Sequence, residues 1–116
     1  MSATLAIATD GSPVSATWFA SEARTSRGVI VVAPALSTPR RFYAPFCEYL
    51  IAQGFDALVF DYRGIESGRA REARASMTDM ETWLRVDVSA AIDEAARRSD
   101  GKPVHLIGHS LGGMAL

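Results

Sequence analysis

Three short apolar runs, separated by segments with helical spacing, most constrain the fold of this chain. They are RGVIVVAPA, DALVFD and VHLIG, and they predict strands over residues 28–33, 56–61 and 104–108. Continuous apolar runs of this kind are typical of strands buried on both faces of a parallel sheet. Strands that alternate with helices build such a sheet through right-handed crossovers. We therefore expect an α/β fold with a mostly parallel sheet and helices on both of its faces.

The segments around the first apolar run also carry clear patterns. Residues 4–20 predict two short strands joined by a tight turn at Asp10-Gly11. A helix is predicted over residues 42–53, where Pro45 suits a first turn and Gly54 a C-terminal cap. Its apolar residues recur at spacings of three and four, which predicts an inner face of Phe42, Phe46, Tyr49 and Leu50.

A second helix is predicted between the second and third apolar runs. Thr78 and Glu81 form a capping box, and the helix should run to about Arg98. Its predicted inner face consists of Met80, Leu84, Val88, Ala91 or Ile92, and Ala95.

The third apolar run leads directly into Gly108-His109-Ser110-Leu111-Gly112. A Gly-x-Ser-x-Gly sequence between a strand and a helix is the setting in which a sharp turn lifts a serine hydroxyl above the sheet edge. The alternative, a glycine-rich phosphate cradle, lacks the Lys-Ser/Thr ending of a P-loop. Ser110 is therefore the candidate nucleophile, and we expect it to have a positive φ.

Two motifs make the chain resemble the N-terminal half of an α/β-hydrolase, of the serine aminopeptidase-like or monoacylglycerol-lipase-like type. The first is the GHSLGG turn at residues 108–113, and the second is Asp61-Tyr62-Arg63-Gly64, which is similar to the family's Asp-x-Arg-Gly turn. The resemblance extends over essentially the whole chain. It implies that residues 1–116 are the N-terminal part of a single, incomplete α/β-hydrolase domain.

The chain departs from the family pattern at two places. Ile65-Glu66-Ser67-Gly68 stands where the family usually has a second glycine and a serine, and Pro34-Ala35 replaces the frequent His-Gly after the third strand. In the family, the backbone N–H that follows this dipeptide and the one that follows the nucleophile hold the developing oxyanion. The resemblance therefore implies Leu36 and Leu111 as the oxyanion donors.

The base and the acid of a catalytic triad are not expected in this chain. The family order of nucleophile, acid and histidine implies that both lie beyond Leu116. Neither His105, in the strand, nor His109, beside the serine, is expected to reach the hydroxyl, so both are interpreted as structural. Asp61, Asp87 and Asp93 all precede the serine, against the family order, and Asp61 is interpreted as fixing its own turn.

The resemblance implies a serine hydrolase without cofactor or metal, acting on a small-molecule ester, thioester or amide through an acyl-serine intermediate. The 116-residue chain alone is predicted to be inactive. A non-catalytic module with a degenerate serine turn and an acyltransferase stay open as alternatives. Sequence beyond Leu116 would distinguish them.

Composition limits the partners. The formal net charge is −1, so nothing favours nucleic acid or an anionic membrane surface, whose binding depends on unbalanced Lys and Arg. The N-terminal run LAIA is too short for a signal peptide or a membrane span, and the single Cys47 favours a buried free thiol. We therefore expect a cytoplasmic protein.

Two features bear on contacts with other molecules. The strand over 104–108 should form a sheet edge in this chain, which invites self-association. A group of arginines could meet an anionic substrate, although a solvated loop is the favoured interpretation: Arg63, Arg69, Arg71 and Arg74.

Overall fold

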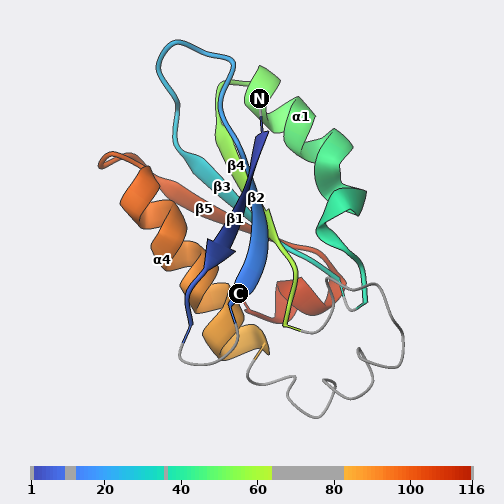
Figure 1. Ribbon diagram of the computed structural model, residues 1–116. Helices are drawn as coiled ribbons and strands as arrows, with labels where there is room; N and C mark the ends of the chain where they lie inside the picture. Colours follow the sequence, from blue (N-terminus) through green and yellow to red (C-terminus); the bar gives the residue numbers. More distant parts are fainter. Residues whose placement is uncertain (1, 10–12, 36, 64–82, 116) are drawn as a thin grey trace.

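A five-stranded mixed sheet forms the centre of the molecule (Figure 1). The computed structural model describes residues 2–9, 13–35, 37–63 and 83–115. The strand order is β1-β2-β4-β3-β5, with β2 antiparallel to both β1 and β4, and with β4, β3 and β5 parallel to one another. The bounds are β1 Ser2–Ile7, β2 Val14–Phe19, β3 Val29–Ala33, β4 Asp56–Phe60 and β5 Val104–Gly108. The predicted ribbon and all three predicted parallel strands are confirmed, whereas the Asp10-Gly11 turn lies outside the described residues.

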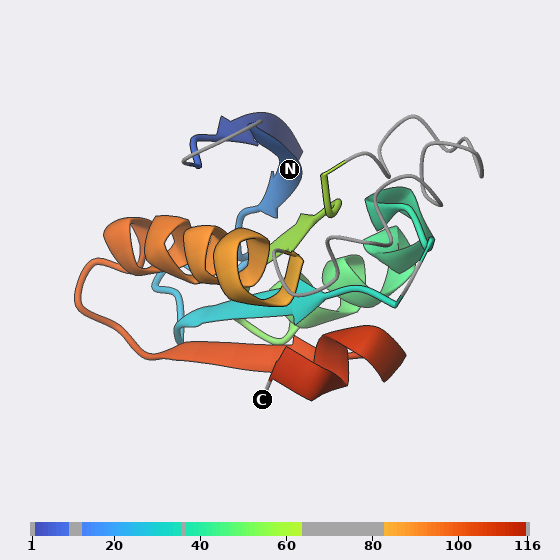
Figure 2. The same cartoon turned by 90° about the horizontal axis from the view of Figure 1, so that it is seen from below.

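Helices cover both faces of the sheet, as predicted. The helix α4 (Val88–Arg98) packs on the face that carries Val29 and Val31, and α1 (Ala44–Ala52) packs on the face that carries Ile30 and Val32. Because successive side chains of a strand point to opposite faces, β3 is buried on both sides. Figure 2 shows α4 lying along β3 and β5, with the short helix η4 (Ser110–Ala115) leaving the end of β5.

The helix α1 presents a different face to the sheet from the one predicted. A 3-10 turn, η1 (Arg40–Tyr43), leads into α1, Pro45 lies in its first turn, and Gly54 follows it with a φ of 94°. The predicted inner face was wrong, because Phe42, Phe46 and Tyr49 are 65%, 39% and 59% exposed. The buried residues are Tyr43, Cys47, Leu50 and Ile51.

The prediction failed because the predicted set and the observed buried set both have helical spacing, and Leu50 belongs to both sets. Apolar side chains cover more than one side of this short helix, so spacing alone cannot select the buried side. The position of η1, which leads into α1, decides which side of the helix is buried.

The second helix follows its prediction more closely. A π-helical turn, η3 (Trp83–Asp87), continues directly into α4. Val88, Ala91 and Ala95 are buried, and Leu84 and Ile92 pack against them partly exposed. The capping box at Thr78 and the predicted Met80 contact lie outside the described residues. No helix within the described parts of the chain is long and apolar enough to cross a membrane.

The strand β5 lies at one edge of the sheet. It pairs with β3 on one side, and the strand order ends there among the described residues. Its side chains alternate between half-buried and exposed, so the expectation of a strand buried on both faces was wrong, and the expectation of an edge strand is confirmed. Val104 and Leu106 face α4, which leaves His105 and Ile107 on the α1 side.

Candidate active site

The turn after β5 has the backbone geometry expected of a nucleophile-bearing serine. Ser110 has a φ of 56°, is exposed, and is the first residue of η4. A positive φ is uncommon for a residue with a side chain and costs on the order of 1 to 3 kcal/mol where it persists. The predicted position and φ of Ser110 are confirmed, and its role as nucleophile stays a prediction.

Two glycines allow this turn to pack closely. A Cβ atom at Gly112 would overlap the backbone carbonyl of Ala33, at the end of β3. A Cβ atom at Gly108 would overlap the backbone of Gly112. Gly112 also donates its N–H to the carbonyl of His109 (3.1 Å). The first and last glycines of the motif are therefore required by steric contact with backbone atoms, which side chains cannot relieve by moving.

The segment that follows β3 is fixed at three consecutive residues, Ala33–Ala35. The carbonyl of Ala33 accepts a hydrogen bond from the backbone N–H of His109 (3.0 Å). The carbonyl of Pro34 accepts one from the Tyr62 hydroxyl (3.0 Å), and Ala35 donates its N–H to the Tyr43 hydroxyl (2.8 Å). Leu36, the predicted oxyanion donor, lies outside the described residues. The three residues before Leu36 are thus held against the serine turn, the turn after β4 and the segment that enters α1.

Tyr62 is buried and keeps its hydroxyl as a hydrogen-bond donor. It is 1% exposed, and its ring stacks on Trp83 with ring centroids 5.6 Å apart. Burial raises the pKa of Tyr62 far above its ordinary value, and the nearby Tyr43 and Asp87 raise the pKa further. The phenol therefore remains protonated and can donate to Pro34 throughout the ordinary pH range.

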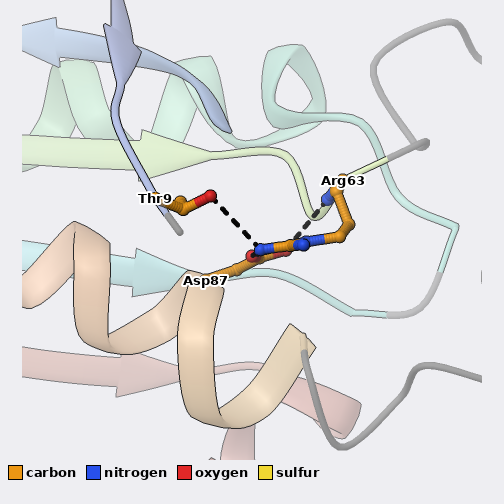
Figure 3. Close-up of polar contacts among 3 residues, drawn as sticks. All are labelled: Thr9, Arg63 and Asp87. Carbon is orange, nitrogen blue, oxygen red and sulfur yellow. Dashed lines mark hydrogen bonds and ion pairs between the residues drawn. The ribbon is translucent and has the colours of Figure 1, made fainter. Parts of the chain in front are cut away.

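A buried ion pair joins the turn after β4 to the start of the second helix (Figure 3). Arg63 donates through Nε (3.0 Å) and one terminal nitrogen (2.8 Å) to one oxygen of Asp87, and through its backbone N–H (3.0 Å) to the other. The same guanidinium reaches the Thr9 hydroxyl (3.4 Å), at the end of β1. Asp87 is fully buried, so Arg63 is a structural partner within this site and not part of a solvated loop. The other three predicted arginines lie outside the described residues.

Among the described residues, the Asp61 side chain binds the start of η1, a role that the sequence did not predict. Its predicted role in its own turn, which continues outside the described residues, stays a prediction. The buried carboxylate of Asp61 accepts hydrogen bonds from the backbone N–H of Arg40 (2.6 Å) and from the Arg40 guanidinium. The guanidinium also donates to Thr17 of β2 (2.9 Å). A carboxylate at the end of β4 thus positions the start of η1, which in turn sets the rotation of α1.

The two histidines make contacts away from the serine hydroxyl. Nδ1 of His109 lies 2.9 Å from the Tyr43 hydroxyl, and the ring of His105 lies edge-on to Phe55 on the α1 side of the sheet. Both contacts fit the structural interpretation of these residues. The side chain of Leu111 is 7% exposed and packs in the core beneath α4, so it anchors the start of η4, while its oxyanion role stays a prediction.

Metal-binding and thiol chemistry find no support in the described part of the chain. No group of three or more His, Cys, Asp or Glu side chains lies close enough there to hold a metal ion. Burial, with a smaller effect of Glu48, raises the pKa of Cys47 from 9.0 to about 12, so the thiol is a poor nucleophile at neutral pH.

Sequence reasoning missed the structural roles of four polar residues that shape this site: Arg40, Tyr43, Tyr62 and Asp87. Tyr62 and Asp87 had a usable signal, because each is a polar or charged residue next to a strongly apolar run. Arg40 and Tyr43 had none, since their partners are 21 and 66 residues away in the sequence.

Comparison with known proteins agrees with this geometry. The profile of the serine aminopeptidase S33 family matches residues 24–116. No curated protein sequence matches the chain. A thermostable carboxyl esterase from Bacillus coagulans superposes with a TM-score of 0.77 at 19% identity, over 98% of this chain and 38% of the esterase.

Two further structures have the same fold. An α/β serine hydrolase without a lid from Xanthomonas campestris has a TM-score of 0.77 at 16% identity, over 98% of this chain and 53% of its own. A dienelactone hydrolase from Anabaena variabilis has a TM-score of 0.74 at 16% identity, over 99% of this chain and 54% of its own. The chain thus spans between about two fifths and about half of the solved structures it matches. It belongs to the serine aminopeptidase S33 family of α/β-hydrolases.

Proposed function

We propose that the protein is a serine hydrolase that cleaves a small-molecule ester, thioester or amide through an acyl-serine intermediate on Ser110. The observation that carries the proposal is the positive φ of Ser110 at the end of β5, in a turn closed by Gly108 and Gly112. The carboxyl esterase and dienelactone hydrolase among the structural neighbours favour an ester as the substrate.

The proposed reaction has two steps. The hydroxyl oxygen of Ser110 attacks the carbonyl carbon while its proton passes to a histidine, and the tetrahedral oxyanion is held by the backbone N–H groups of Leu36 and Leu111. Collapse expels the leaving group, which takes up the proton, and water then hydrolyses the acyl-serine by the same route. No cofactor or metal is needed for this chemistry.

We also propose that residues 1–116 are the N-terminal part of one α/β-hydrolase domain, and that the histidine and the acid follow Leu116. The share of each neighbour that the chain spans supports this proposal. The exposed edge of β5 then favours self-association when the 116-residue chain is expressed alone. A buried, free Cys47 suits a reducing compartment such as the cytoplasm.

The test begins with the reading frame beyond Leu116. We expect an acid followed by a histidine, and we expect the full-length protein to hydrolyse a p-nitrophenyl ester and to react with a fluorophosphonate. Ser110→Ala should abolish labelling and lower kcat by about 10⁶. The 116-residue chain alone should show neither activity.

Full-length protein that does not label, or that retains its activity in the Ser110→Ala form, would overturn the proposal. Absence of a downstream acid and histidine would favour a degenerate module. Faster transfer of the acyl group to an added alcohol than to water would favour an acyltransferase.

A further inference from the structure

The hydroxyl of Tyr43 lies between the segment after β3 and the serine turn. Ala35 donates its backbone N–H to this oxygen (2.8 Å), and Nδ1 of His109 lies 2.9 Å from it. Tyr43 is only 6% exposed, so these two protein groups, and not bulk water, satisfy its hydroxyl. The rings of Tyr43 and His109 also meet edge-on, with centroids 5.8 Å apart.

The direction of these hydrogen bonds follows from the groups available. The backbone N–H of Ala35 can only donate, so the phenolic oxygen accepts from it. In the arrangement that also gives the hydroxyl hydrogen an acceptor, Nδ1 of His109 offers its lone pair and the ring proton lies on Nε2. A single hydroxyl therefore links two segments that are 74 residues apart in the chain.

His109 is linked to the segment after β3 in two ways. Its backbone N–H binds the carbonyl of Ala33 directly, and its side chain binds Ala35 through Tyr43. The two links lie on either side of Pro34. Together they restrain both the distance and the rotation of the serine turn relative to the end of β3.

We propose that Tyr43 is a positioning residue that keeps the segment after β3 in register with the serine turn by joining Ala35 to His109. Its effect on catalysis rests on the proposed function. In sequence, Leu36 follows Ala35 and Leu111 follows Ser110, so each side of the link carries one proposed oxyanion donor. Donors must be held at hydrogen-bond distance from the oxyanion to stabilise it, so loss of the link should slow the chemical step more than it weakens substrate binding.

The first test compares Tyr43→Phe with Tyr49→Phe in the full-length protein. Both changes remove one phenolic hydroxyl, but Tyr49 lies on the exposed side of α1. With a p-nitrophenyl ester, Tyr43→Phe should lower kcat about tenfold and change KM by less than about twofold. Tyr49→Phe should match the wild type. An unchanged kcat in Tyr43→Phe, or a change confined to KM, would overturn the proposal.

The second test reads the link without using activity. Nitrogen-15 NMR of uniformly labelled protein should give His109 an unprotonated Nδ1 and a protonated Nε2, and Tyr43→Phe should shift both signals together with the amide of Ala35. Signals of His109 and Ala35 that stay unchanged in Tyr43→Phe would overturn the proposal.

A double-mutant cycle sharpens the result. Tyr43→Phe combined with His109→Ala should lower kcat no further than the more harmful single change, because both remove the same link. Additive losses would show that the two side chains act separately and would overturn the proposal. Failure of the proposed function is recognised differently, since wild-type protein would then not react with a fluorophosphonate while the NMR signature of the link remained.

Discussion

The two ends of the parallel strands differ in how they hold charged side chains. At the carboxyl end, Asp61 and Asp87 are 2% and 0% exposed, and each is bound by an arginine and by a backbone N–H. At the amino end, Glu94 pairs with Arg97 and Arg98 on the last turns of α4, where the two arginine side chains are 65% and 38% exposed. The carboxylates are thus buried at the carboxyl end, whereas at the amino end Glu94 keeps 18% of its side chain exposed and pairs with more exposed arginines.

The difference shows where the fold needs fixed geometry. Burying a charge costs several kcal/mol before its partner offsets the cost, whereas an exposed pair costs little and contributes little. The buried pairs at the carboxyl end each join segments that are far apart in the sequence and border the serine turn. We infer that these pairs are retained for the positions that they fix rather than for stability alone.

Among the substitutions at the carboxyl end, Gly112→Ala should lower the free energy of unfolding the most. The new Cβ would overlap the carbonyl of Ala33, which cannot move freely because it accepts the hydrogen bond of His109. We expect a loss of about 4 kcal/mol in the free energy of unfolding, measured by urea denaturation of the full-length protein. Gly113→Ala is the matched control, because its Cβ would have its nearest contact at 3.7 Å. Equal stabilities of the two variants would contradict the close approach.

Asp87→Asn tests the buried ion pair directly. The amide keeps the shape of the carboxylate, but it removes the buried negative charge that faces the guanidinium of Arg63, which is 19% exposed. Breaking a buried pair on one side should cost about 3 kcal/mol, and 1 M salt should change this cost little because the pair is shielded from solvent. The control is Asp93→Asn on the exposed side of α4, for which we expect a change below about 0.5 kcal/mol.

Tyr62→Phe removes one hydrogen bond of the segment after β3. The carbonyl of Pro34 then loses its donor while the aromatic stacking with Trp83 is kept. We expect a loss of about 1 to 2 kcal/mol in the free energy of unfolding, with Tyr49→Phe as the neutral control. A loss no greater than that of the control would mean that water replaces the hydroxyl at Pro34.

The existence of the parallel strands and of α4 could be predicted because each segment has a clear pattern of apolar residues. β3 is apolar throughout, and α4 has charges on one side, so their buried faces follow from spacing and polarity. The helix α1 could not be predicted in the same way. Phe42, Phe46 and Tyr49 compete with Tyr43 and Cys47 for the inner face, and contacts distant in sequence, such as that between Asp61 and Arg40, favour the second set.

The serine turn could be predicted for a related reason. Gly108, Ser110 and Gly112 lie close together in the sequence, so a short sequence motif reveals the steric requirements of the turn. The residues that orient the turn are not local. Tyr43 precedes His109 by 66 residues, and a contact at that separation leaves no periodic trace in a single sequence.

The smallest expected change in the free energy of unfolding is at the amino end, for a substitution of Glu94. This substitution tests whether charged side chains at that end contribute little to stability. The hydrogen bond from Arg98, with help from Arg97 and against partial burial, lowers the pKa of Glu94 below its ordinary value. The unfolded carboxyl, with a pKa of about 4.3, therefore binds a proton more readily than the folded one, so the contribution of Glu94 is present above that pH and is lost as the pH falls through the folded pKa.

Glu94→Gln should accordingly cost only about 0.5 kcal/mol at pH 7, because both arginines remain solvated. The difference from the wild type should shrink as the pH falls through the folded pKa of Glu94, and it should also shrink in 1 M salt. Urea denaturation at pH 7 and at a series of acidic pH values measures it. A cost above about 2 kcal/mol, or one that persists at low pH, would mean that the amino end also depends on fixed charges and would remove the contrast between the two ends of the sheet.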